Sequence, residues 1–152
     1  MNTVEQMTHK NAADQEFLPL LRALVRAYQA FGAYDTAGYA GVDLTVAQAD
    51  VIFTLGNTDG LCFKDIGEKT LITKGTLTGV IERLEAKGLV KKTSSATDRR
   101  HVIVMLTTKG RKLFEKEFPR QIAYLKQRFD LLSEKELKEA ERLLSRIQEI
   151  FS

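Results

Sequence analysis

Residues 63–88 read FKDIGEKTLITKGTLTGVIERLEAKG and contain two helical patterns joined by a short turn. The first helix is expected from Phe63 to Thr70 and the second from Thr73 to Lys87. Gly88 follows the second helix, and glycine commonly ends helices because it tolerates a left-handed backbone. The apolar side chains of the second helix recur at i, i+3, i+4 and i+7, as Leu77, Val80, Ile81 and Leu84. Two short helices joined in this way predict a helix-turn-helix.

A β-hairpin is expected directly after the second helix. Leu89–Thr93 is short and extended, and apolar residues alternate at period 2 over Val102–Leu106. Residues 94–100 between them read SSATDRR, which is small and polar up to Asp98 and then basic. A hairpin with a positively charged tip, added to the two helices, describes a winged helix.

Amphipathic helices are expected on both sides of this central segment. One runs from Phe17 to Asp35, and a capping box at Thr45–Gln48 opens another that ends near Gly56. Thr107 should cap a long helix over 108–130, and Ser133 with Glu136 forms a second capping box. Three of the helices outside the winged helix each carry a stripe, meaning a row of apolar side chains along one face. The stripes are Leu21, Leu24, Tyr28 and Phe31; Phe114, Phe118, Ile122, Leu125 and Phe129; and Leu137, Ala140, Leu144, Ile147 and Phe151. The predicted fold is mainly α, with a winged helix-turn-helix between helices from both ends of the chain.

Composition and charge narrow the class of protein. The chain has 152 residues, of which 43% are hydrophobic and 28% charged, as in an ordinary globular protein. It has no apolar run near the ~18 residues of a membrane span and no secretory signal, so we expect a cytoplasmic protein without a membrane partner. Residues 61–100 carry nine Lys/Arg against five Asp/Glu, whereas residues 1–60 carry three against seven. This asymmetry is typical of a phosphate-binding surface, although it also arises by chance in ordinary proteins.

The stretch from Leu44 to Gly110 resembles the multiple-antibiotic-resistance regulator (MarR) family of bacterial transcription factors. Four motifs carry the resemblance in order and spacing: LTxxQ over 44–48, TLT over 76–78, RLExxGLV over 83–90, and DRR over 98–100 followed by LTxxG over 106–110. The helices outside this stretch match only in pattern. Val46 stands where a proline is common, and Cys62 stands near a helix start where serine or threonine is more usual.

The resemblance implies a homodimer whose N- and C-terminal helices interlock and whose two winged helices bind double-stranded DNA at a palindromic operator. Such proteins usually repress nearby genes and leave DNA when a small-molecule effector binds. We therefore expect one MarR-type domain over 1–152, with a DNA-binding part over 45–107 and dimerisation helices over 12–40 and 108–152. No cofactor is expected.

The outer face of the second helix is the first candidate DNA contact. Gly75 and Gly79 lie opposite the buried stripe, and each costs about 1 kcal/mol of helix stability relative to alanine. A close approach of the backbone to a groove floor would justify that cost, and a solvated helix that tolerates two glycines is the alternative. The candidate DNA-binding residues on this helix are Thr73, Lys74, Gly75, Thr76, Thr78 and Arg83.

The tip of the hairpin is the second candidate contact. Arg99 and Arg100 are long and permanently charged. In the family the arginine two positions after the aspartate enters the minor groove, which implies this role for Arg100 and a shaping role for Asp98. A basic solvated loop is the alternative. Lys91 and Lys92 on the preceding strand are expected to touch phosphates or only water.

Catalysis and metal binding fit the sequence poorly. No nucleophile elbow or glycine-rich phosphate loop is present, and His9, His101 and Cys62 are not spaced as a ligand cluster. Cys62 stands at a helix start close to Lys64, so a thiol-based redox regulator is one alternative function, although lone cysteines are usually inert. A winged-helix protein-interaction module without DNA binding is another. Tyr28 and Phe31 could line an effector pocket or pack in the core.

Overall fold

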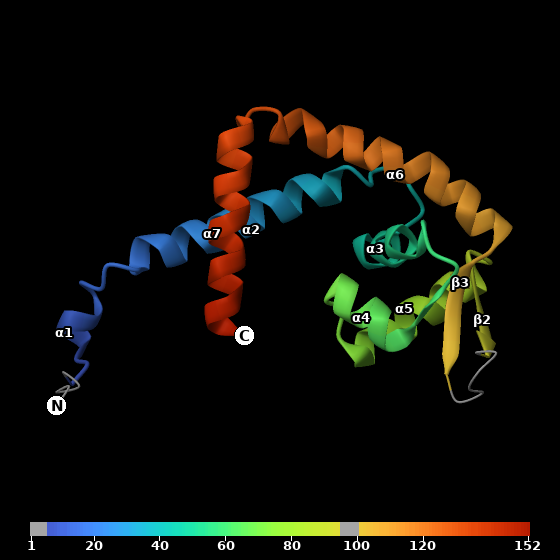
Figure 1. Cartoon of the computed structure of the whole chain (residues 1–152), viewed down its shortest axis with the longest axis horizontal. Coiled ribbons are helices and arrows are strands. Elements are labelled where there is room, and N and C mark those ends of the chain that lie inside the picture. The colour runs from blue at the N-terminus through green and yellow to red at the C-terminus, as the bar shows by residue number, and fades with distance from the viewer. Residues whose placement is uncertain (1–5, 95–100) are drawn as a thin grey trace. The chain divides into compact units, whose positions relative to one another are not determined.

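The structure is a computed structural model that describes residues 6–94 and 101–152. The elements follow the order α1 (His9–Ala12), α2 (Leu18–Ala37), α3 (Val46–Leu55), β1 (Leu61–Cys62), α4 (Phe63–Thr70), α5 (Lys74–Ala86), β2 (Val90–Ser94), β3 (Val102–Leu106), α6 (Thr108–Phe129) and α7 (Glu134–Phe151) (Figure 1). The chain divides into two compact units, and the boundary between them in the sequence lies between Ala40 and Gly41. The predicted mainly α winged-helix class is confirmed.

The hydrophobic core lies in the second unit, among α3, α4, α5 and a three-stranded antiparallel sheet of order β1-β3-β2 (Figure 1). The four stripe residues of α5 are at most 4% exposed, which confirms the face that its spacing predicts. They pack with other buried side chains that include Ala49, Ile52, Leu55, Ile66 and Val104. The outer face of α5 is therefore the face left for other contacts.

The sheet contains the predicted hairpin and one strand that the sequence did not indicate. β2 and β3 pair from Val90 opposite Leu106 to Ser94 opposite Val102. The unpredicted β1 has two residues, Leu61 and Cys62, which pair with β3. Two residues are too few to show a period in sequence. The short α1 helix was also not expected, and a capping box between Thr8 and Asn11 opens it.

The predicted helix caps are confirmed. Thr45 and Gln48 exchange two hydrogen bonds of 3.1 Å at the start of α3. Ser133 and Glu136 exchange bonds of 2.7 and 3.2 Å at the start of α7. Gly88 follows α5 with φ +72°, the left-handed conformation expected of a glycine after a helix.

The first turns of α6 dock on the winged helix. The Thr107 backbone N–H donates to the Leu89 carbonyl at 3.0 Å, and the Thr107 hydroxyl donates to the Gly88 carbonyl at 2.6 Å. Further along, Arg111 donates to the carbonyl of Gly56 at 2.9 Å. The rings of Phe53, Phe114 and Phe118 then pack together, with Phe118 centroids 5.1 and 5.2 Å from the other two. This half of α6 is thus fixed to the end of α5 and to α3.

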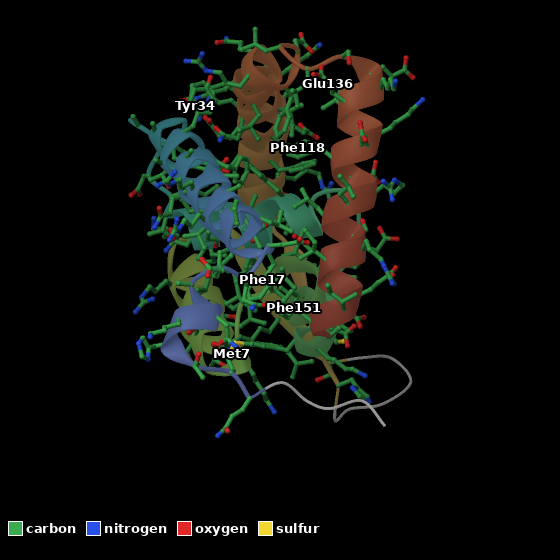
Figure 2. All side chains as sticks on the ribbon, turned by 90° about the vertical axis from the view of Figure 1, so that its left-hand side faces the viewer. Met7, Phe17, Tyr34, Phe118, Glu136 and Phe151 are labelled. Atoms are coloured by element: carbon green, nitrogen blue, oxygen red, sulfur yellow. The ribbon has the colours of Figure 1, made fainter. Side chains whose placement is uncertain are left out.

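The outer helices leave their apolar stripes exposed in the single chain. Neither α2 nor α7 has a buried residue. The stripe of α6 changes along its length, since Phe114 is buried whereas Ile122 and Phe129 are 47% and 45% exposed. Figure 2 shows Glu136 and Phe151 at opposite ends of α7, and its stripe residues Leu137, Leu144 and Phe151 are 39%, 53% and 83% exposed.

An open apolar cleft of about 490 Å³ runs between the end of α6 and α7. Its lining residues are Phe129, Leu132, Leu137, Ala140, Glu141, Leu144, Ser145 and Gln148. Within the described residues, no helix is both long and apolar enough to cross a bilayer.

Candidate nucleic-acid interface

The start of α5 leaves its positive end open to solvent. Thr73 occupies the N-cap position, but its side chain makes no capping hydrogen bond. Its hydroxyl instead bonds to the Thr76 hydroxyl at 3.1 Å. The first N–H groups of a helix have no partner within the helix and carry a partial positive charge. An anion such as a phosphate can therefore be bound at this end.

The outer face of α5 is smooth because two of its residues lack side chains. Apart from the nearby helix backbone, a Cβ built on Gly75 would meet no described atom within 4 Å, and one built on Gly79 would meet the Arg83 guanidinium at an ordinary contact distance of 3.9 Å. Neither glycine is therefore required for the packing of the described chain. The packing of the described residues therefore does not explain why α5 contains two residues of low helix propensity.

The predicted contact residues of α5 are brought together on exposed surface. Thr73, Lys74, Gly75, Thr76, Thr78 and Arg83 are all exposed. The Thr78 hydroxyl lies 3.3 Å from the Lys74 carbonyl, so in this rotamer it offers its lone pairs outward. The face combines hydroxyls, a lysine, an arginine and bare backbone, which suits contacts to base edges and phosphates.

Strand β2 places Lys91 and Lys92, for which the sequence predicts the same role, on opposite faces of the sheet. Lys92 lies opposite Val104 in the hairpin, and its ammonium is 3.6 Å from the Glu85 carboxylate of α5. Lys91 projects from the other face of the sheet, because side chains alternate along a strand. Lys91 is therefore better placed for a phosphate contact than Lys92. The predicted contacts Asp98, Arg99 and Arg100 lie outside the described residues.

A set of cations that the sequence did not single out holds α5 in place. The Lys87 ammonium lies 2.7 Å from the Asp43 carbonyl and 3.3 Å from Gln48 Oε1, so it joins the end of α5 to the start of α3. Lys109 of α6 donates to the Lys87 carbonyl at 2.9 Å. These bonds join residues 22 to 44 positions apart, and no local sequence signal could have indicated them.

The geometry around Cys62 gives the thiol alternative no additional support. Cys62 is half-buried and precedes α4, but its side chain makes no capping hydrogen bond. The neighbouring Lys64 lies 4.0 Å from Glu68, four residues further along the helix. Cys62 also belongs to β1, where it pairs with Ile103.

Comparison with known proteins gives concordant matches. A family model described as MarR family matches residues 42–101. The chain is 34% identical over 105 residues to YfiV, an uncharacterized HTH-type transcriptional regulator of Bacillus subtilis, and the match covers 69% of this chain and 66% of YfiV. The chain thus spans just under two thirds of the length of that relative.

Solved structures match over nearly the whole chain. BpsR of Bordetella bronchiseptica is 30% identical, with a TM-score of 0.77 over 88% of this chain and 96% of its own. That structure concerns the regulation of DNA binding of BpsR by 6-hydroxynicotinic acid. AbsC of Streptomyces coelicolor, a MarR family transcriptional regulator, is 22% identical, with a TM-score of 0.80 over 96% of this chain and 97% of its own. The AbsC match concerns the fold alone.

Proposed function

Because the chain belongs to the MarR family of transcriptional regulators, we propose that it is a sequence-specific repressor that a small molecule releases from its operator. The observation that carries the proposal is the bare outer face of α5. Gly75 and Gly79 weaken an exposed helix and are not needed for packing against any described residue, which a close approach to DNA would explain. The protein would act in the cytoplasm.

The proposed DNA contacts divide between two elements. The N-terminal turns of α5 enter the major groove, where Thr73, Lys74, Thr76 and Thr78 reach base edges and phosphates. The wing lies along the neighbouring backbone, with Lys91 on a phosphate and Arg100 in the minor groove.

The proposed assembly is a homodimer. The stripes of α2 and α7 are exposed, and the cleft between α6 and α7 is lined mostly by apolar side chains. Exposed apolar surface gains about 25 cal/mol for each Å² removed from water. A second copy of the chain can bury these apolar surfaces, and the two-fold symmetry of a dimer matches a palindromic operator.

Small-molecule control is proposed from similarity to BpsR, whose DNA binding is regulated by such a compound. The proposal extends to this chain only the principle of regulation and leaves the compound open. Among the described residues, Tyr28 is 77% exposed, so it is better placed for a partner or ligand contact than for the core of the single chain.

A binding experiment with a matched glycine pair tests the proposal. Double-stranded DNA from upstream of the gene is titrated with wild type, Gly75→Ala and Gly32→Ala at two salt concentrations. Both positions have open space for a Cβ, so both variants should fold at least as stably as wild type. Gly75→Ala should bind DNA at least several-fold more weakly, whereas Gly32→Ala should bind as wild type does if its dimer mass is unchanged.

Two outcomes would overturn the proposal at different levels. No binding of wild type to its own upstream DNA at low salt would remove the DNA-binding function. Wild-type affinity in Gly75→Ala would show that α5 does not approach the groove closely.

A further inference from the structure

The guanidinium of Arg83 lies beside the bare backbone at Gly79. The Arg83 Nη1 atom lies 3.9 Å from the point where a Gly79 Cβ would be, and no other described side chain comes within 4 Å of that point. Residues four apart share a helix face, and long side chains on a helix lean toward its N-terminus. The guanidinium therefore lies back along α5 over bare backbone.

No described carboxylate neutralises the charge of this arginine. Among residues 6–94 and 101–152, no carboxylate forms an ion pair with Arg83. The nearby Glu85 is paired with Lys92, and Lys87 is bound to Asp43. Arg83 is exposed, and its donors are available to a ligand.

The place of Arg83 on α5 favours a base edge over a phosphate. Arg83 belongs to the last turn of α5, but its guanidinium reaches back beside Gly79 on the outer face, the face that a recognition helix turns toward base edges. Phosphates line the edges of a groove. Glu82 is exposed one residue earlier, and its negative charge further disfavours a phosphate at this point.

We propose that Arg83, lying across Gly79, reads a guanine in the major groove of each half-site. The guanidinium is a planar fork that donates two parallel hydrogen bonds to guanine O6 and N7, the commonest specific contact between proteins and DNA. A methyl group at Gly79 would meet the guanidinium at an ordinary contact distance, so the reading group is Arg83 itself. The inference rests on the proposed DNA-binding function and names the base that it reads.

Replacement of single guanines tests this contact. A duplex is selected from a random pool with the wild-type protein, and each guanine is replaced in turn by 7-deazaguanine, which lacks the N7 acceptor but pairs normally. One guanine in each half-site should show a loss of roughly 5- to 150-fold in wild-type affinity. Arg83→Ala should bind the unmodified duplex more weakly and show no further loss at that guanine.

Three controls separate a base contact from other roles. Arg142→Ala removes an exposed arginine from α7 and should retain the wild-type response to 7-deazaguanine. Gly79→Ala should fold normally and keep the response at the same guanine, because the added methyl group leaves the guanidinium in place. Arg83→Ala should keep the wild-type salt slope, because a phosphate contact would reduce it by about one unit for each lost contact.

Contrary outcomes are distinguishable. Equal 7-deazaguanine responses in wild type and Arg83→Ala, or a reduced salt slope in Arg83→Ala, would overturn the guanine contact while leaving DNA binding intact. A wild-type protein that enriches no sequence and binds no duplex at low salt would overturn the proposed function itself.

Discussion

The α-carbon of Gly110 lies against the backbone carbonyl of Leu89, and a Cβ on Gly110 would fall far inside contact distance of that oxygen. The contact brings the first turn of α6 onto the link between α5 and β2. Because the obstructing atom belongs to the backbone, it cannot rotate away as a side chain would. Only glycine fits at position 110 without moving α6.

Gly110→Ala should destabilise the protein even though alanine is the better helix former. The gain of about 1 kcal/mol in helix propensity is outweighed by overpacking, which typically costs about 1–3 kcal/mol. Urea unfolding measures the net loss. The same substitution at Gly75, where space is open, serves as the control, and equal stability of the two variants would refute this account of the contact.

Arg100→Ala should weaken binding at every operator and reduce the salt slope by roughly two units per dimer. The loss should be greatest where the flanking DNA is A·T-rich, because a narrow minor groove attracts arginine. Thr76→Ala should instead change the preferred bases and leave the slope nearly unchanged. Titrations of DNA with both variants at several salt concentrations compare the two contacts. An unaltered affinity and salt slope in Arg100→Ala would exclude the wing as a DNA contact.

Pro119→Ala should change DNA affinity or effector response without unfolding the protein. Pro119 lies inside α6, where it lacks an N–H and crowds the preceding turn. It directly follows Phe118, the last of the three packed rings of α3 and α6. DNA titrations with and without effector compare variant and wild type, and superimposable curves would exclude a role for the proline in setting the spacing of the two winged helices.

Deletion of residues 137–152 should give a chain that aggregates or whose α2 and α6 unfold, because the remaining stripes lose the surface that covers them. Leu144→Lys is a milder test, since Leu144 is 53% exposed and lines the cleft beside α7. This variant should shift the mass in solution from dimer toward monomer. A well-folded monomeric deletion variant, or a wild-type mass of one chain, would contradict the dimer.

The start of α7 should be sensitive to acid. Hydrogen bonds from the Ser133 backbone and hydroxyl lower the pKa of Glu136 from its ordinary value of 4.5. A lowered pKa in the folded state means that the stabilisation is present above 4.5 and is lost as pH falls through the folded-state pKa. Ser133→Ala should raise the pKa of Glu136 in an NMR titration. Acid-induced loss of helix that is identical in Glu136→Gln and wild type would argue against this role.

Local features of this fold could be predicted from sequence, because the interactions that define them span three or four residues. The caps at Thr45 and Ser133 and the limits of α4 are of this kind, as is the buried stripe of α5. Its exposed face, with most of the candidate contacts, follows from the same periodicity.

Features made by distant residues could not be predicted. The Gly110–Leu89 contact and the Arg111 bond to Gly56 depend on how α6 docks, and no spacing encodes them. Lys91 and Lys92 could not be distinguished until the hairpin register placed Lys92 beside Glu85.

The winged helix and the outer helices differ in how the burial of their apolar side chains depends on protein concentration. All the buried hydrophobic residues of the described chain lie between Leu44 and Phe114, so the winged helix can fold without a partner. The stripes of α2 and α7 become buried only when the proposed dimer forms, and association of this kind is governed by mass action. On dilution the subunits would separate while each winged helix stayed folded. The fraction of operator that is bound would then rise more steeply than the protein concentration does. The cell would thus have a threshold protein concentration above which the operator is occupied.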